Sequence, residues 1–166
     1  MKILLTSTFL IFSWTVRGQI SNLNFDWYNP KYFIAKAYLY GLGEEPAGDI
    51  IEYGRLNKTV TDTIGVTLTN EQVRKVISVA TGNNSGKIEE LAECFIPHHG
   101  IVFYDKDKRP LASVTICFYC RRMTFIPETV TPEKGLGILK KVILELKFPI
   151  FNDQMDYIDY GIKLKK

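Results

Sequence analysis

Hydrophobic and polar residues follow two different spacings along this chain, and each spacing predicts its own kind of secondary structure. The aromatic stretch 33–40 is predicted to be a strand, because β-branched and aromatic residues favour a pleated surface. In the segment 59–68, hydrophobic residues alternate with threonines, which predicts a half-buried strand with Ile64 and Val66 on its inner face.

Helical spacing appears in two other segments. Residues 70–81 place hydrophobic side chains on one helical face; Thr69 and Gln72 form a capping-box pattern at their start, and Gly82 follows them. The segment 132–147 carries a second hydrophobic stripe and begins with a proline, which is favoured in the first turn of a helix. The sequence therefore predicts two helices, each with one face turned toward a core.

A β-hairpin is predicted at about 100–118. Residues 101–104 and 111–118 are rich in β-branched and aromatic side chains, and the polar stretch 105–110 between them is typical of a turn. Strands joined by a short turn pair in the antiparallel direction. Together with the two helices, the hairpin predicts an α+β fold with a small, mostly antiparallel sheet and two packed helices.

Two further segments leave more than one interpretation open. Residues 87–95 fit either a short helix or a strand, and the tail from Phe151 onward is predicted to be a final strand or an irregular packing segment. In that tail, Asp153, Asp156 and Asp159 recur at helical spacing, which is also compatible with the solvated face of a tail helix.

The first residues have the layout of a secretory signal peptide. Lys2 precedes an apolar run at 3–16, and small residues stand where the cut is expected, so 1–18 is predicted to be removed. The rest, 19–166, has the size of a single α+β domain. The apolar run is shorter than the roughly 20 residues that cross a bilayer. We therefore expect an exported protein, periplasmic or extracellular, with no stable membrane insertion after cleavage.

Composition and charge narrow the possible functions. The chain has 46% hydrophobic and 23% charged residues, as globular proteins do, and its net charge of +3 is too small to indicate a nucleic-acid partner. The sequence contains no G-x-S-x-G, H-E-x-x-H, P-loop or dinucleotide-binding motif, so the common hydrolase and nucleotide-binding classes lack support. Glycosylation sequons at Asn57 and Asn83 would matter only in a host that glycosylates exported proteins.

The three cysteines and two histidines of the chain all lie within one short window: Cys94, His98, His99, Cys117 and Cys120. A hairpin centred on the polar turn would place the histidines opposite the end of its second strand, next to Cys117. Opposed residues have Cβ atoms about 5 Å apart, so an imidazole and a sulfur would meet at the open end of the hairpin. The clustering therefore predicts one shared site.

Three chemical interpretations of this site follow from its residue types. Three thiolates from Cys94, Cys117 and Cys120, with His99 as fourth ligand, would complete a structural zinc site, and His98 would point outward or support the ligands. An oxidising compartment instead favours a disulfide from Cys94 to Cys117 or Cys120, which leaves one buried thiol. In the third interpretation, Cys117 and Cys120 form a redox-active pair.

The motif Cys94-Phe-Ile-Pro-His-His-Gly-Ile-Val-Phe-Tyr-Asp, followed by Cys117-Phe-Tyr-Cys120, resembles a pattern in a group of small exported bacterial proteins with no assigned activity. The resemblance covers about a quarter of the chain that follows the predicted signal peptide. It implies a shared site and no particular reaction.

Three functional hypotheses remain after the sequence is read. The leading one is an exported binding or interaction module of the cell envelope, stabilised by the cysteine–histidine site, with a protein partner that the sequence does not identify. The second is an enzyme that uses Cys117 and Cys120 in thiol–disulfide exchange, or that uses a metal with an open coordination position. The third is an immunity or inhibitor protein that blocks a secreted toxin.

Overall fold

The computed structural model describes residues 25–86, 92–129 and 134–165. The predicted signal peptide lies outside the described residues, as do most of the ambiguous stretch at 87–95 and the predicted start of the second helix. The described part of that stretch, from Ala92 to Phe95, has no helix or strand.

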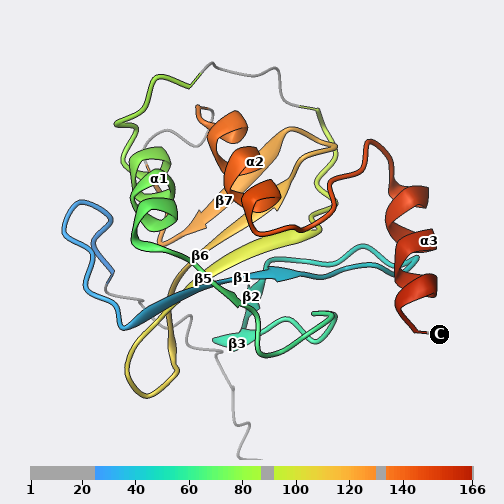
Figure 1. Cartoon of the computed structure of the whole chain (residues 1–166), viewed down its shortest axis with the longest axis horizontal. Coiled ribbons are helices and arrows are strands. Elements are labelled where there is room, and N and C mark those ends of the chain that lie inside the picture. The colour runs from blue at the N-terminus through green and yellow to red at the C-terminus, as the bar shows by residue number, and fades with distance from the viewer. Residues whose placement is uncertain (1–24, 87–91, 130–133, 166) are drawn as a thin grey trace, which may run out of the picture.

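The main element is a five-stranded sheet in which every pairing is antiparallel (Figure 1). Its strand order is β4 (Val66–Thr67), β1 (Ile34–Leu39), β5 (His99–Tyr104), β6 (Pro110–Cys117) and β7 (Arg122–Ile126). The predicted α+β class and the predicted hairpin are both confirmed, since β5 and β6 are neighbours joined by the polar turn.

One face of the sheet is covered by α1 (Asn70–Ala80) and α2 (Leu136–Glu145), which pack against each other (Figure 1). The capping box predicted for the first helix is present: the Thr69 hydroxyl accepts a hydrogen bond from the Gln72 N–H, and the Gln72 side chain accepts one from the Thr69 N–H. The two predicted packed helices are therefore confirmed, the first almost to the residue.

The second helix is shorter than predicted. It begins at Leu136 instead of 132, because Gly135 lies in the left-handed region at φ 99° and so cannot continue a right-handed helix. It ends at Glu145 instead of 147, where Lys147 is also left-handed at φ 63°. The hydrophobic stripe was correctly identified, but a stripe does not fix helix ends.

The opposite face of the sheet is covered by a small hairpin, β2 (Ile51–Glu52) and β3 (Arg55–Leu56), and by the loop before it. Gly100 in β5 leaves room there for Ile50, whose backbone N–H donates to the Thr115 hydroxyl. The strand β5 is consequently buried along its whole length, with a hydrophobic core on each side.

The predicted strand at 59–68 is wrong in extent and in facing. Only Val66 and Thr67 form a strand, and Val60 contributes an isolated bridge to Tyr40. Ile64 is 70% exposed and Val66 is 39% exposed, although both were expected to face inward. Between them Gly65 is left-handed at φ 65°, which breaks the alternation of faces that a continuous strand requires.

The tail folds as a helix, α3 (Gln154–Leu164), instead of a strand or irregular segment. Asp153 caps it, since its carboxylate accepts a hydrogen bond from the Asp156 N–H. Only Tyr157 and Gly161 of this helix are buried, and α3 stands to one side of the sheet (Figure 1). Among the described residues, no helix has the length and hydrophobicity needed to cross a membrane.

The packing of Ile50 against Gly100 can be tested with two glycine-to-alanine variants. Gly100→Ala places a methyl group within the Ile50 side chain, and we expect the free energy of unfolding to fall by about 1–3 kcal/mol from overpacking. Gly137→Ala is the matched control on α2: its Cβ meets no atom within 4 Å, so the variant should be stabilised by about 0.5–1 kcal/mol. Urea denaturation measures the free energy of unfolding of both variants. Equal changes in the two would contradict the close packing of Ile50 against Gly100.

Candidate functional site at the open end of the hairpin

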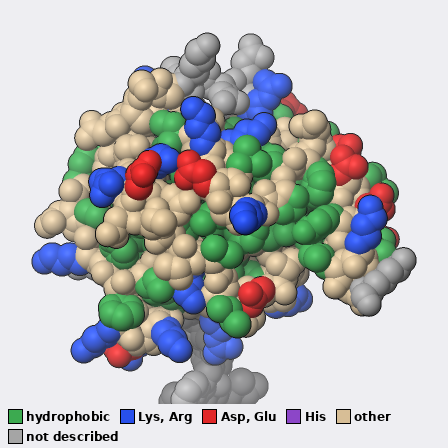
Figure 2. Space-filling view, in the orientation of Figure 1, with side chains coloured by type: hydrophobic (Ala, Val, Ile, Leu, Met, Phe, Trp, Pro, Cys, Tyr) green, Lys and Arg blue, Asp and Glu red, His purple; other side chains and the backbone are tan. Residues whose placement is uncertain are grey.

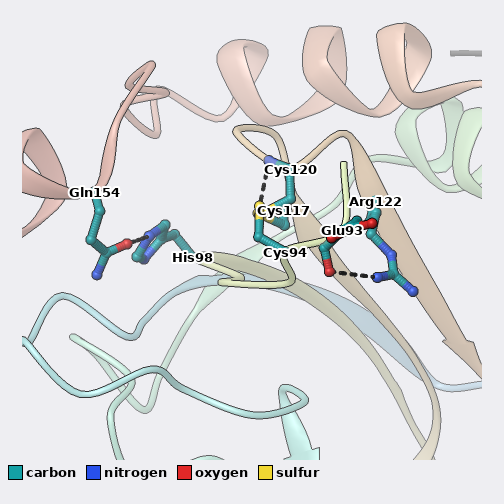
Figure 3. Close-up of a disulfide and its surroundings, with 7 residues drawn as sticks. All are labelled: Glu93, Cys94, His98, Cys117, Cys120, Arg122 and Gln154. Atoms are coloured by element: carbon teal, nitrogen blue, oxygen red, sulfur yellow. Dashed lines mark hydrogen bonds between the residues drawn. A yellow bond between two sulfur atoms is a disulfide. The ribbon is translucent and has the colours of Figure 1, made fainter. Parts of the chain in front are cut away.

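The three cysteines lie together where the hairpin opens (Figure 3). Cys117 is the last residue of β6, and Cys120 lies in the turn that leads to β7. Cys94 forms a disulfide with Cys120, with Cα atoms 5.5 Å apart, and Cys117 is a free, buried thiol. Of the three interpretations, the structure therefore has the second, a disulfide from Cys94 to Cys120 with Cys117 as the remaining buried thiol.

Contacts with the start of β7 bring Cys94 to this position. The Ala92 N–H donates to the Cys120 carbonyl, and the Arg122 guanidinium donates to the Glu93 carbonyl (Figure 3). The same guanidinium lies 5.7 Å from the centre of the Phe95 ring. These contacts hold the chain segment around Cys94 against the turn, so the disulfide joins two segments that already touch.

The Cys117 thiol is enclosed by its own turn. Its Sγ accepts a hydrogen bond from the Cys120 N–H at 3.1 Å, and the side chain has no exposed surface. Burial raises the pKa of this thiol, against smaller lowering effects from backbone hydrogen bonds and from Arg122. A raised pKa keeps Cys117 protonated at neutral pH, which is the opposite of what a nucleophilic cysteine needs.

His99 is fully buried in β5 and is bonded to the segment that follows α2. Its Nε2 lies 2.8 Å from the Pro149 carbonyl. A carbonyl only accepts, so Nε2 carries the proton and donates. Burial lowers the pKa of His99 to about 3, which keeps the ring neutral. The other nitrogen, Nδ1, is buried without a hydrogen-bond partner among the described residues.

His98 points toward α3, away from the sulfur atoms (Figure 3). Its ring stacks on Tyr157 with 3.7 Å between ring centres, and its Nε2 lies 2.8 Å from the Gln154 side-chain oxygen. Burial lowers the pKa of His98 as well. The two histidines therefore fasten the C-terminal segment to the sheet, one through Pro149 and the other through α3.

The predicted zinc ligands do not form a donor set in this arrangement. The sulfur atoms of Cys94 and Cys120 are bonded to each other, and zinc binds thiolates. Over the described ranges, no group of three or more Cys, His, Asp or Glu residues is arranged to hold a metal ion. Zinc binding by Cys94, His99, Cys117 and Cys120 would thus require the reduced chain, and His98 would lie outside the ligand set.

Sequence reasoning missed the residues that bond the histidines: Pro149, Gln154 and Tyr157. No motif marks them, because they are brought to β5 only by the path of the chain after α2. The helical spacing of the acids in the tail was the one available signal that α3 exists.

A second candidate site is a groove of about 640 Å³ at the other end of the same hairpin. It lies between the start of β1, the β3 strand, the loop before β4 and the turn that joins β5 to β6. Its floor includes Tyr38 and Tyr104, and two exposed hydrophobic side chains, Phe33 and Ile64, stand at its walls.

Comparisons of the chain with models of known protein families, with curated proteins and with solved structures find no match. The resemblance to small exported bacterial proteins therefore stays a prediction.

Because burial lowers the pKa of both histidines, we expect the folded protein to lose stability in mild acid. The folded state holds His99 neutral, whereas the unfolded chain binds a proton below its ordinary pKa of about 6.5, so protons favour unfolding. We expect the free energy of unfolding to fall by about 2 kcal/mol between pH 7 and pH 5 from His99, with a further loss from His98. Urea denaturation at pH 7, 6 and 5 measures this slope.

The His99→Gln variant separates this effect from other titrations. Glutamine keeps a side-chain N–H for the Pro149 carbonyl but does not titrate, so the variant should show a slope that is shallower by about 2 kcal/mol over the same pH range, whatever its stability at pH 7. An unchanged slope would mean that His99 is not the neutral buried group described above.

The disulfide closes a loop between residues 26 positions apart, and its removal should destabilise the protein strongly. Loop-closure entropy predicts that Cys94→Ser loses about 3.5 kcal/mol of unfolding free energy. Cys117→Ser is the matched control, since it alters a buried sulfur but keeps the cross-link, and it should lose less. Thermal and urea denaturation without reductant compare the two variants. A larger loss of unfolding free energy in Cys117→Ser than in Cys94→Ser would mean that Cys94 does not form the cross-link.

Proposed function

We propose that this protein is an exported binding or interaction module of the cell envelope, in which the cysteine–histidine cluster stabilises the fold in its oxidised form. One observation carries the proposal: Cys117, Cys120 and His99 have no exposed surface, and each is already bonded within the protein. A reacting group must reach its substrate, and burial disfavours that for these three side chains, although Cys94, the other half of the disulfide, is half-buried. The cluster is thus best suited to holding chain segments together.

The disulfide supports the exported location. Disulfides persist in oxidising compartments such as the periplasm and the extracellular space, and are rare in the reducing cytosol. Cys94 and Cys120 come from separate segments, so their bond ties the stretch before β5 to the turn after β6. An exported domain gains from such a cross-link where no reductant opens it.

The groove at the turn end of the hairpin is the surface we assign to binding. It is concave and is lined by aromatic, aliphatic and basic side chains, whereas Cys117, Cys120 and His99 at the other end of the hairpin are buried. Binding sites in proteins are usually concave and mostly apolar, with a few polar groups that orient the ligand. An immunity or inhibitor protein would be one form of such a module.

Thiol–disulfide exchange is the second candidate, because a free thiol lies beside a disulfide. The Cys117 sulfur accepts its hydrogen bond from the backbone of Cys120, the residue whose own sulfur is cross-linked. Two features disfavour the reaction: burial raises the pKa of Cys117, and the C-x-x-C segment leads into the strand β7 instead of a helix N-terminus.

Thiol counting with elemental analysis tests the proposal. The native protein should show no fast-reacting thiol, the denatured protein without reductant should show one, and no stoichiometric metal should be found. In Cys117→Ala the count after denaturation should fall to zero, because the disulfide remains. A native thiol that reacts rapidly near neutral pH would favour exchange chemistry, and one metal with three thiols per chain would identify the reduced zinc form.

A further inference from the structure

We infer that the groove binds an extended acidic segment of a partner protein, with an apolar side chain of that segment held between Phe33 and Ile64. The inference rests on the proposed binding function and adds the chemistry of the partner. It is carried by the residues that line the groove, all of which offer either positive charge, hydrogen-bond donors or apolar surface.

The positive charge comes from four side chains on three separate segments: Lys36 in β1, Arg55 in β3, and Lys106 and Lys108 in the turn between β5 and β6. None of the described residues that line the groove is acidic. Figure 2 shows basic side chains interspersed with hydrophobic and a few acidic ones along the lower edge of the molecule, where this turn and β3 lie. The groove therefore favours an anionic ligand.

The acids that neighbour the groove are engaged in their own loops. Asp105 accepts hydrogen bonds from the N–H groups of Asp107 and Arg109, and Asp62 accepts one from the N–H of Ile64. These carboxylates stabilise turns, and none of them is paired with the four cations in the hydrogen bonds and ion pairs found among the described residues. These carboxylates keep their negative charge, and that of Asp62 acts on Tyr38. Glu52 is the cross-strand partner of Arg55, and Asp107 lies between the two turn lysines. The excess of positive charge is therefore a property of the groove lining itself.

The floor of the groove adds a hydrogen-bond donor. The hydroxyls of Tyr38 and Tyr104 are 2.8 Å apart, so one donates to the other. The second hydroxyl proton has no acceptor in the part of the chain that the structure describes. Burial raises the pKa of both tyrosines, so both keep their protons at neutral pH. A ligand carboxylate or carbonyl oxygen is the natural acceptor.

The walls supply the apolar part of the site. Phe33 is 72% exposed and Ile64 is 70% exposed, and both line the same groove. The Lys36 ammonium donates to the Ile64 carbonyl at 2.6 Å and so fixes the loop that presents Ile64. An apolar side chain seated between the two walls would remove both from water.

The distribution of charge favours a peptide over other anions. A small anion such as phosphate needs donors that converge on one point, whereas these cations stand on three separate segments of the groove lining. A bilayer is flat, and the buried hydroxyl pair lies at the bottom of a concave surface that a bilayer does not enter. An extended chain that alternates acidic and apolar residues meets the distributed cations and the walls together.

The test uses a short fluorescein-labelled peptide in which aspartate and glutamate alternate with leucine and phenylalanine. Fluorescence anisotropy with the full exported chain should show binding that weakens as salt rises from 50 to 500 mM, because exposed charges are screened. The same peptide with glutamine and asparagine in place of the acids should bind at least about tenfold more weakly. Equal binding of the two peptides would overturn the inference.

Variants locate the site. Lys106→Glu combined with Lys108→Glu should weaken binding of the acidic peptide about tenfold, and Phe33→Ala should weaken it by a similar factor. Lys163→Glu on α3 and Leu144→Ala on α2 are the matched controls, since each changes an exposed residue of like kind away from the groove and should leave affinity unchanged. Loss of binding in the controls as well would contradict the assignment.

Vesicles of phosphatidylglycerol and phosphatidylcholine distinguish the membrane alternative. Binding to these vesicles, lost in the lysine double variant, without binding to the acidic peptide would overturn the peptide inference but leave a binding module in place. Failure of the proposed function appears elsewhere, in the thiol counts of the native protein. The two failures are therefore separable.

Discussion

The burial of β5 on both of its faces is the constraint on which the remaining structure depends. Its side chains alternate between a core under α1 and α2 and a second core under β2 and β3. Its backbone is satisfied on both sides by β1 and β6, as a buried strand requires. The strands β1 and β6 pair with β5, β4 and β7 extend the sheet from those two, and the helices α1 and α2 and the β2–β3 hairpin cover its faces, so the position of β5 sets theirs.

The two ends of the β5–β6 hairpin have different roles for the same reason. At the open end, His99 faces Ile116, and the side chains there are enclosed by the disulfide and the C-terminal segment. At the turn end, Tyr104 is buried but lines an open groove, and the cations of the turn extend into solvent. One hairpin thus carries a cross-linked, buried cluster at one end and an open groove at the other.

The histidines show how a residue type that suggests chemistry serves packing. A neutral imidazole has one donor, and His99 uses it on the Pro149 carbonyl while its ring fills the space beside Phe118. His98 does the same toward Gln154, with Tyr157 stacked on its ring. Neutrality is maintained by burial, so these contacts hold at neutral pH and weaken in acid.

The sequence by itself determined the features that depend on neighbours in the chain: the first helix with its capping box, the hairpin register that pairs His99 with Ile116, and the α+β class. Tertiary structure alone decided that Cys94 bonds Cys120, that 59–68 is broken at Gly65, and that α3 packs on the histidines. The physical reason is range. Capping and strand alternation act over a few residues, whereas the choice among three sulfur atoms and the burial of an imidazole depend on segments that meet only after folding.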